Sequence, residues 1–505
     1  MKKLILLFIG ILSMSISNAQ GIQDALRYSE DEIRGTARYR AMSGAFGALG
    51  GDMSAVSINP AGSAIFSRSH ASLTLSNESK DNDISYFNGF NSSSNSDFDL
   101  NQTGVVFVFN NTNTNSDWRK FVFGFAYDKI QNYDDDWFAF GTNNQSIDEY
   151  FLANAQGLRL DEISAFPGES ISDAYLDIGE IFGYTHQQAF LGYESYILEP
   201  QSDTDDNTVY TSNVAPGSFE QDYTLASSGY NGKFSFNLAT QYQDNIYLGL
   251  NLNSHFVNYD RLSYFYEGNN NVGSIVNEIG FENVLSTTGT GFSFQLGGIA
   301  KVSDRLRVGL TYNSPTWLRF QEETTQFIST LRDDGGIPTS ATVDPQVVNI
   351  YPDYKIQTPG KITGSAALVF DQKGILSFDY SRKDYSNTKF KPESDAYFVA
   401  QNNILSNSLK AANSYKMGGE YRHGNFSFRG GYRFEESPYE NTDIVGDLTG
   451  YSLGLGYSFG NTKLDLSFDQ SQRESEYQFF DVGFTDAASL DTKNTNIMLS
   501  LGFTL

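Results

Sequence analysis

The stretch GTARYRAMSGAFGALGGDMSAVSINPAG, residues 35–62, is rich in glycine and alanine and poor in bulky side chains. Arginines cluster at its start, and Asn59-Pro60-Ala61-Gly62 closes it. Such a segment has too little apolar area to form a hydrophobic core of its own. It must therefore pack against another part of the chain. Because a long series of alternating strands follows it, we expect it to lie inside a β-barrel.

The residues before this stretch have the pattern of a secretory signal peptide. Lys2 and Lys3 form a charged start, residues 4–16 form an apolar run, and Ser17-Asn18-Ala19 is a small-x-small cleavage site before Gln20. A membrane anchor is the weaker interpretation, because the apolar run is too short to span a bilayer. We therefore assign residues 1–19 to a signal peptide and expect an exported protein.

Composition favours a transmembrane β-barrel. No later segment has 18 consecutive apolar residues, which argues against membrane helices. Aromatic residues nevertheless make up 15% of the 505 residues, and glycine reaches 46. An exported, aromatic-rich chain without spanning helices is typical of an outer-membrane barrel. A secreted array of β-sandwiches is the alternative. The absence of cysteine excludes disulfides, lipidation of a mature terminal cysteine and thiolate sites.

Acidic residues concentrate in one segment. The chain has a formal net charge of −26, and residues 132–222 hold 18 Asp and Glu against Arg159 alone, a balance of 1 − 18 = −17. Nucleic-acid binding needs a basic surface, so we expect no nucleic-acid partner.

From residue 67 onward the apolar residues alternate with small or polar ones. In the last strand Ile497, Leu499 and Leu501 alternate with Met498 and Ser500. A lipid-facing exterior and a polar lumen require this period of two. The pattern predicts an all-β fold of fourteen antiparallel strands. They lie near 70–76, 103–110, 119–130, 223–241, 246–266, 287–302, 305–319, 356–370, 374–386, 411–422, 425–436, 448–459, 462–475 and 493–505.

Short and long connections alternate between these strands. Tight hairpins such as Gly460-Asn461 alternate with long loops such as 77–102, 131–222 and 387–410. Short periplasmic turns, long external loops and an even strand number are the features of an outer-membrane barrel, and a sandwich does not predict them. We therefore expect residues 67–505 to form a transmembrane β-barrel and residues 20–66 to form a plug, or hatch, inside its lumen.

The loop 131–222 is too long to be structureless. Residues 147–155, 174–184 and 188–198 mix aromatic and aliphatic residues with Asp and Glu, and each is predicted to be a short amphipathic helix. We expect a lid at the outer mouth, with a solvated, variable surface loop as the alternative. Another helix is expected over 395–409.

These motifs resemble the FadL family of outer-membrane transporters for long-chain fatty acids and hydrocarbons, in the version found in Bacteroidetes. The resemblance rests on ARYRAMSGAFGALGGDMSAVSINPAG with its Asn59-Pro60-Ala61 triplet, on Thr358-Pro359, on Asp379-Tyr380-Ser381 to Phe390, and on YKMGGEYRHGNFSFRGGYRFEESP at 415–438. It covers nearly all of the mature chain. The acidic loop and the terminal Leu505, where many outer-membrane strands end in Phe, depart from the pattern.

The resemblance implies a fourteen-stranded barrel plugged by the N-terminal hatch, in the cell outer membrane of a Gram-negative bacterium. It implies passive uptake of hydrophobic compounds such as long-chain fatty acids, with the hatch as gate and, in some members, a lateral opening in the wall. The expected partners are outer-membrane lipid, lipopolysaccharide and a hydrophobic small molecule. Some family members act in secretion or assembly complexes, so a non-transporting subunit that docks through the acidic loop remains the alternative.

Candidate site residues fall into three sets. The hatch motif comprises Gly44, Gly47, Gly50, Asn59, Pro60 and Ala61. Arg34, Arg38 and Arg40 are expected to pair with inward carboxylates such as Asp465 and Asp469 and so to hold the hatch. The strand alternation directs Arg429, Arg433, Lys416 and Arg307 into the lumen, where they are candidate contacts for a substrate carboxylate. The alternative is that these four pair with inward carboxylates and only fill the lumen.

Catalysis and metal binding have weak support. Gly450–Gly454 matches G-x-S-x-G, but Ser452 lies in an alternating strand rather than in the strand–turn–helix that a nucleophile elbow requires, so an esterase is a remote alternative. The four histidines have no ligand spacing, and the aspartate runs at 134–136 and 203–206 lack the rest of a calcium loop. We expect no enzyme activity, no cofactor and no metal site.

Overall fold

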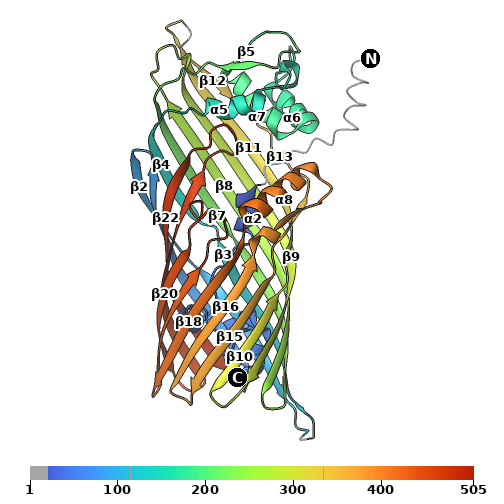
Figure 1. The fold of residues 1–505 in the computed structure, drawn as a ribbon, viewed down its shortest axis with the longest axis vertical. Coiled ribbons are helices and arrows are strands. Elements are labelled where there is room, and N and C mark those ends of the chain that lie inside the picture. Colours follow the sequence, from blue (N-terminus) through green and yellow to red (C-terminus); the bar gives the residue numbers. More distant parts are fainter. Residues whose placement is uncertain (1–20, 114, 334) are drawn as a thin grey trace.

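The computed structural model describes residues 21–113, 115–333 and 335–505 (Figure 1). The predicted signal peptide, residues 1–19, lies outside the described residues. Among the helices of the described ranges, none has the length and apolar character needed to cross a membrane.

The body of the molecule is a closed antiparallel barrel with fourteen transmembrane strands, each called a stave below because four of them consist of two shorter strands in succession. Ten staves are single strands: β1 His70–Tyr86, β2 Gly89–Asn110, β7 Phe219–Tyr242, β8 Ile246–Gly268, β9 Val276–Lys301, β18 Ala411–His423, β19 Phe426–Glu435, β20 Leu448–Ser458, β21 Thr462–Gln478 and β22 Ala487–Thr504. Four are built from two strands in succession: β3 Trp118–Asn132 with β4 Asp135–Asn143, β10 Leu306–Asn313 with β11 Trp317–Asp333, β14 Tyr354–Gln357 with β15 Lys361–Phe370, and β16 Gly374–Asp384 with β17 Lys389–Lys391. Pairing of β1 with β22 closes the barrel.

The predicted alternation is confirmed along the staves. On β22 the outward Ile497 is 50% exposed, whereas the neighbouring inward Met498 is fully buried. The outward side chains are apolar because they meet lipid, and the inward ones are small or polar because they meet the hatch. The short turns and Leu505 lie at one end of the barrel, and the long connections lie at the other (Figure 1). By the rule for outer-membrane barrels, these are the periplasmic and outer ends.

The outer half of the barrel is taller than the sequence predicts. Residues 77–102, expected to be a loop, continue β1 and β2 as a paired hairpin that turns at Phe87 and Asn88. Their sequence is rich in Ser, Asn and Asp, so it has no apolar alternation from which a strand could be recognised. Pairing of β1 with β2 continues through this hairpin all the same, and on its inner face Ile84 and Tyr86 are buried in the apolar cluster that joins lid and barrel.

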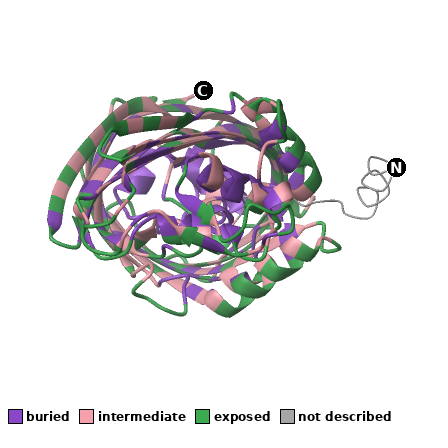
Figure 2. Ribbon diagram, turned by 90° about the horizontal axis from the view of Figure 1, so that it is seen from above, coloured by how far each residue is buried: buried purple, intermediate pink, exposed green. Residues whose placement is uncertain are grey.

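The N-terminal segment lies within the ring of strands (Figure 2). It contains the short helices α2 Ile22–Arg27, α3 Ala37–Arg40 and α4 Met53–Ile58 and the 3-10 helix η1 Pro60–Ile65, and an extended segment separates α2 from α3. Most residues from 35 to 64 are buried. The small side chains of this stretch therefore pack against the barrel wall, as its composition requires.

A helical lid covers the outer end. It consists of α5 Asp148–Ala155, η2 Leu160–Glu162, α6 Ile171–Phe182, α7 Tyr184–Glu194 and the two-stranded β5 Leu198–Pro200 and β6 Tyr210–Ser212. All three predicted lid helices are present, and α8 Ala396–Ser408 matches the fourth. The other external connections hold β12 Pro338–Val343, β13 Asn349–Ile350 and η3 Tyr385–Asn387. One continuous apolar cluster joins Tyr150, Phe151 and Phe190 of the lid to barrel residues such as Phe281.

Candidate functional site

The Asn59-Pro60-Ala61 triplet fastens the hatch to the wall. Asn59 is fully buried, and its Nδ2 donates to the carbonyls of Gly47 at 2.7 Å and of Gly298, on β9, at 3.2 Å. Its Oδ1 accepts from the Ala61 backbone N–H at 3.1 Å and so caps η1. Asn237 on β7 donates to the Pro60 carbonyl at 3.0 Å. The triplet is thus a hydrogen-bonded junction between two hatch loops and two staves.

Glycine allows the hatch to touch the wall with its backbone. A Cβ on Gly47 would lie 2.0 Å from Ser365 Oγ, and one on Gly309 of β10 would lie 2.4 Å from the Gly47 carbonyl oxygen. Wall residue Asp379 accepts from the backbone N–H groups of Phe46 and Gly47, at 3.0 and 2.9 Å. Gly44 and Gly50 both have positive φ, at +79° and +64°, so their turns favour glycine.

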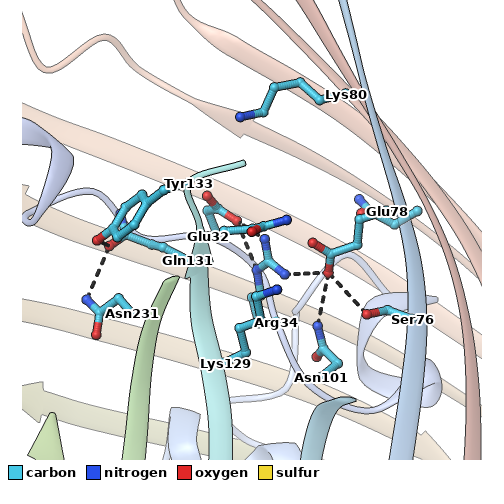
Figure 3. Close-up of polar contacts among 12 residues, drawn as sticks. Glu32, Arg34, Ser76, Glu78, Lys80, Asn101, Lys129, Gln131, Tyr133 and Asn231 are labelled. Atoms are coloured by element: carbon cyan, nitrogen blue, oxygen red, sulfur yellow. Dashed lines mark hydrogen bonds and ion pairs between the residues drawn. The ribbon is translucent and has the colours of Figure 1, made fainter. Parts of the chain in front are cut away.

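Three arginines of the hatch form ion pairs with inward carboxylates. Arg38 pairs with Glu420 on β18 at 2.8 Å, and Arg40 pairs with Asp469 on β21 at 2.6 Å through two nitrogens. Arg34 contacts Glu78 on β1, which also accepts from Asn101 (Figure 3). Of the two carboxylates expected as partners of these three arginines, Asp469 pairs with Arg40, whereas Asp465 binds Arg429 of the wall.

The four basic residues proposed as substrate contacts lie beside the hatch and have protein partners. Arg429 binds Glu420 at 2.7 Å and Asp465 at 2.6 Å, and Arg307 donates to the Leu49 carbonyl at 3.1 Å. Arg433 and Lys416 both pair with Glu435, at 3.4 and 3.8 Å. Three of these residues are thus in ion pairs with wall carboxylates, and Arg307 binds a backbone carbonyl of the hatch.

An aromatic-lined cavity lies higher, between the lid, α2 and the wall. Its volume is about 460 Å³. Tyr150 and Tyr184 of the lid, Phe265 and Phe281 of the wall, and the start of the hatch at Gly21 line it. Phe479 and Phe480, in the β21–β22 connection, complete the aromatic wall and stack against Tyr223 and Phe281 respectively. This upper pocket can hold a hydrophobic molecule.

Arg261 is the basic residue of the upper pocket. It extends inward from β8, and its Nε is buried without a hydrogen-bond partner within the described chain. A buried, incompletely bonded guanidinium needs an acceptor. The sequence analysis missed this residue, although Arg261 shares the inward parity of Val257 and Tyr259 on the same strand.

Two carboxylates lie at the upper pocket. Asp24 of α2 is paired with Arg27 at 2.5 Å. Asp481 is in the β21–β22 connection outside the membrane-spanning strands, and burial raises the pKa of its carboxyl. The pocket thus combines aromatic walls with Arg261, and burial makes ionisation of Asp481 less favourable.

The barrel wall is interrupted beside the hatch. β2 pairs with β3 from Asn110 as far as Gln102, opposite Asp128, and beyond that point the described residues of β2 pair only with β1. Side chains bridge the break instead: Asn95 donates to the Asp136 carbonyl at 3.2 Å, and Lys80 donates to that of Asp134 at 3.0 Å. A polar cavity of about 530 Å³ lies against this break and reaches hatch residues 30–34.

Ser452 of the G-x-S-x-G match lies in the middle of β20. Its Oγ is 2.8 Å from the Ser43 hydroxyl and accepts from the Ser43 backbone N–H, so it belongs to the contact between hatch and wall. Among the residues that the structure describes, no group of three or more His, Cys, Asp or Glu side chains is arranged to hold a metal ion.

Comparisons with known proteins agree with this architecture. The sequence profile of the family described as outer membrane protein transport protein (OMPP1/FadL/TodX) matches residues 204–504. A Pseudomonas aeruginosa FadL homologue has the same fold at 12% identity, with a TM-score of 0.53, over 94% of this chain and 99% of that one. The Pseudomonas putida toluene transporter TodX is 13% identical, with a TM-score of 0.52 and the same coverage. No curated protein sequence matches the chain. Because the family profile covers more than half of the sequence, the chain belongs to the OMPP1/FadL/TodX family of outer-membrane transport proteins, located in the outer membrane of Gram-negative bacteria.

Proposed function

We propose that this protein is a passive channel for amphipathic hydrophobic compounds with an anionic head, such as long-chain fatty acids, and that it has no catalytic activity. Arg261 carries the proposal: it lines an aromatic pocket beneath the lid, and its buried Nε has no hydrogen-bond partner among the described residues. A guanidinium recognises a carboxylate through charge-assisted hydrogen bonds, and aromatic walls bind an alkyl chain by burying its apolar surface. The two halves of such a molecule therefore find matching surfaces in the upper pocket.

The hatch is proposed as the gate of the channel. In the conformation described, residues 35–65 fill the lower lumen through buried ion pairs and backbone contacts with the wall. A ligand in the upper pocket touches the start of the hatch, since residues 21–24 line that pocket. The break between β2 and β3 is the proposed exit, because the polar cavity beside it connects hatch residues with the side of the barrel.

The name of the TodX structure, a toluene transporter, raises the question of whether an uncharged hydrocarbon is the substrate here as well. Toluene would use the aromatic walls and leave Arg261 without an acceptor. An anionic amphiphile satisfies both surfaces, and for this reason we favour it. The acidic lid does not exclude it, because long-range repulsion between exposed charges is screened at physiological salt.

The test compares binding of decanoate and toluene to the purified protein, in the wild type and in Arg261→Gln. Loss of one charge-assisted interaction of about 1.5–3 kcal/mol should weaken decanoate binding roughly 10- to 100-fold. Toluene binding should change little. Arg319→Gln is the matched control, because that arginine is on the exposed outer face of β11, paired with Asp353. If decanoate binds the wild type and the Arg261 variant equally, or binds neither, the proposal fails.

A further inference from the structure

A single hatch carboxylate bridges two lysines of the barrel wall. Asp31 lies between α2 and α3, and its Oδ2 is 2.8 Å from Lys361 Nζ while its Oδ1 is 3.2 Å from Lys383 Nζ. Lys383 also donates to the carbonyl of Ser29, two residues earlier. These contacts hold the extended segment 29–34 of the hatch against the wall.

The two lysines are neighbours in the barrel wall, independently of the position of the hatch. Lys361 on β15 and Lys383 on β16 are direct partners in the antiparallel register, so their ammonium groups project inward side by side. Like charges placed opposite each other destabilise a sheet unless an anion lies between them. Within the described part of the chain, both lysines form their ion pairs with Asp31, a residue of the hatch and not of the wall.

Neighbouring lysines of the same chamber differ in this respect. Lys416 pairs with Glu435 on the adjoining stave at 3.8 Å, and Lys233 on β7 pairs with Asp128 on β3 at 3.8 Å. Their counter-charges belong to the barrel itself and stay in place when the hatch moves. Lys361 and Lys383 alone in this set of four depend on a hatch residue for charge balance.

The site is accessible from the lumen. The Asp31 side chain is 45% exposed, whereas those of Lys361 and Lys383 are 22% and 10% exposed. Asp31 lines a chamber of about 150 Å³ on one side and the larger polar cavity at the wall break on the other. The chamber has the volume of about five water molecules, enough for a carboxylate head with a short piece of its chain.

We propose that Lys361 and Lys383 form a second anion site on the transport path, and that Asp31 occupies it in the closed state as an internal substitute for the carboxylate of the substrate. An arriving carboxylate displaces Asp31, keeps the two ammonium groups neutralised and frees residues 29–34 from the wall. This exchange replaces one carboxylate by another, so it avoids the penalty of leaving buried lysines unpaired. An uncharged hydrocarbon cannot make the exchange.

This inference rests on the proposed function for its substrate class and adds a step that selects for the head group. The carboxylate of the substrate is then bound at two successive sites: Arg261 in the upper pocket, and the lysine pair between that pocket and the wall break. The alkyl chain is held by the aromatic pocket, and the charge releases the hatch.

The test measures binding stoichiometry by calorimetry on the purified full-length protein, with decanoate and 1-decanol as probes. Asp31→Asn should vacate the lysine pair and add a second decanoate equivalent without a second decanol equivalent. The triple variant Asp31→Asn, Lys361→Gln, Lys383→Gln should no longer bind the second decanoate equivalent. Asp97→Asn is the matched control: Asp97 also pairs with a lumen lysine, but that residue, Lys129, keeps Asp99 as a partner at 2.8 Å.

The outcomes separate the two proposals. In Asp31→Asn combined with Arg261→Gln, the upper site should be lost and the lysine site retained. If Asp31→Asn binds no more decanoate than Asp97→Asn, or if its added site accepts decanol equally well, the inference is overturned, whatever Arg261 does. Heat-dependent migration of the barrel in detergent gels shows that each variant is folded, so loss of binding is not misread as loss of the site.

Discussion

At the scale of single residues, the fit between hatch and wall depends on glycines, which have no side chain. Gly249 on β8 and Gly309 on β10 face the backbone of the hatch, where a Cβ would lie 2.2 and 2.4 Å from the nearest hatch atom. No rotamer change relieves a clash between a Cβ and a backbone atom. The shape of the wall at these glycines thus fits the hatch, in addition to the ion pairs that hold the hatch in place.

Gly309→Ala tests this fit. The new Cβ would lie 2.4 Å from the Gly47 carbonyl oxygen, so the hatch must shift, and we expect a loss of about 1–3 kcal/mol, seen as a lower thermal midpoint. Leakage of small solutes into liposomes should rise with it. Gly364→Ala on the paired stave β15 is the control, since nothing lies within 4 Å of its Cβ position. Equal behaviour of the two variants would contradict a close fit at Gly309.

At the scale of elements, the hatch is held by charge as well as by shape. Arg38 and Arg40 both lie on the short helix α3. Arg38 binds Glu420 on β18 and Arg40 binds Asp469 on β21, so one turn of helix is attached to two separate staves. Both arginines are largely buried. Such pairs add little net stability, but removing one partner is costly because the other charge stays buried.

Arg40→Ala should destabilise the hatch by about 3–5 kcal/mol, because Asp469 remains buried without its cation. We expect higher permeability to small solutes in liposome swelling and greater sensitivity of cells to large antibiotics. Adding Asp469→Ala should restore part of the loss by removing the stranded charge. Arg319→Ala on the barrel exterior should leave permeability as it is. Unchanged permeability in Arg40→Ala would count against the plug.

The lid shows how local signals define an element. Ser170 accepts from the Asp173 backbone N–H at 3.1 Å and caps α6, and Gly183, with a φ of +89°, ends it. Tyr175 of α6 donates to Gln326 on β11 at 2.7 Å, so the helix is tied to the barrel rim. The sequence predicted all three lid helices but placed the third at 188–198, four residues later than α7, and their docking over the pocket depends on rim residues distant in the chain.

At the scale of the whole molecule, the surface divides into a lipid-facing girdle and a polar outer part. Leu453 on β20 is 59% exposed and points outward, among the apolar side chains of neighbouring staves. Phe90 has a similar exposure, 61%, but lies on the Ser- and Asn-rich end of the β1–β2 hairpin. Equal exposure thus means lipid contact in one place and water contact in the other.

Leu453→Arg should destabilise the barrel in lipid by about 2–4 kcal/mol, because the charge enters the hydrocarbon layer. Phe90→Arg, with the same change of side-chain charge, should have little effect because its surroundings are aqueous. Urea unfolding in liposomes measures both. A large cost for Phe90→Arg would show that the membrane reaches further up the barrel than the girdle indicates.

The sequence by itself determined the barrel, because each stave carries its own two-residue period and each short turn its own turn residues. It also determined the hatch, since residues 35–62 cannot form a core alone. It did not reveal the height of β1 and β2, because residues 77–102 are rich in Ser, Asn and Asp and hold too few apolar residues to show a two-residue period.

Only the tertiary structure decided which inward charges are available to a ligand. Alternation places Arg429 and Arg261 equally in the lumen. Arg429 is bound by Glu420 and Asp465, whereas Arg261 lines an aromatic pocket and its Nε has no hydrogen-bond partner in the part of the chain that the structure describes. The same holds for Lys361 and Lys383, whose counter-charge comes from Asp31, more than 300 residues earlier in the sequence. Strand periodicity fixes the direction of a side chain, but its partners come from staves and hatch segments that only closure of the barrel brings together.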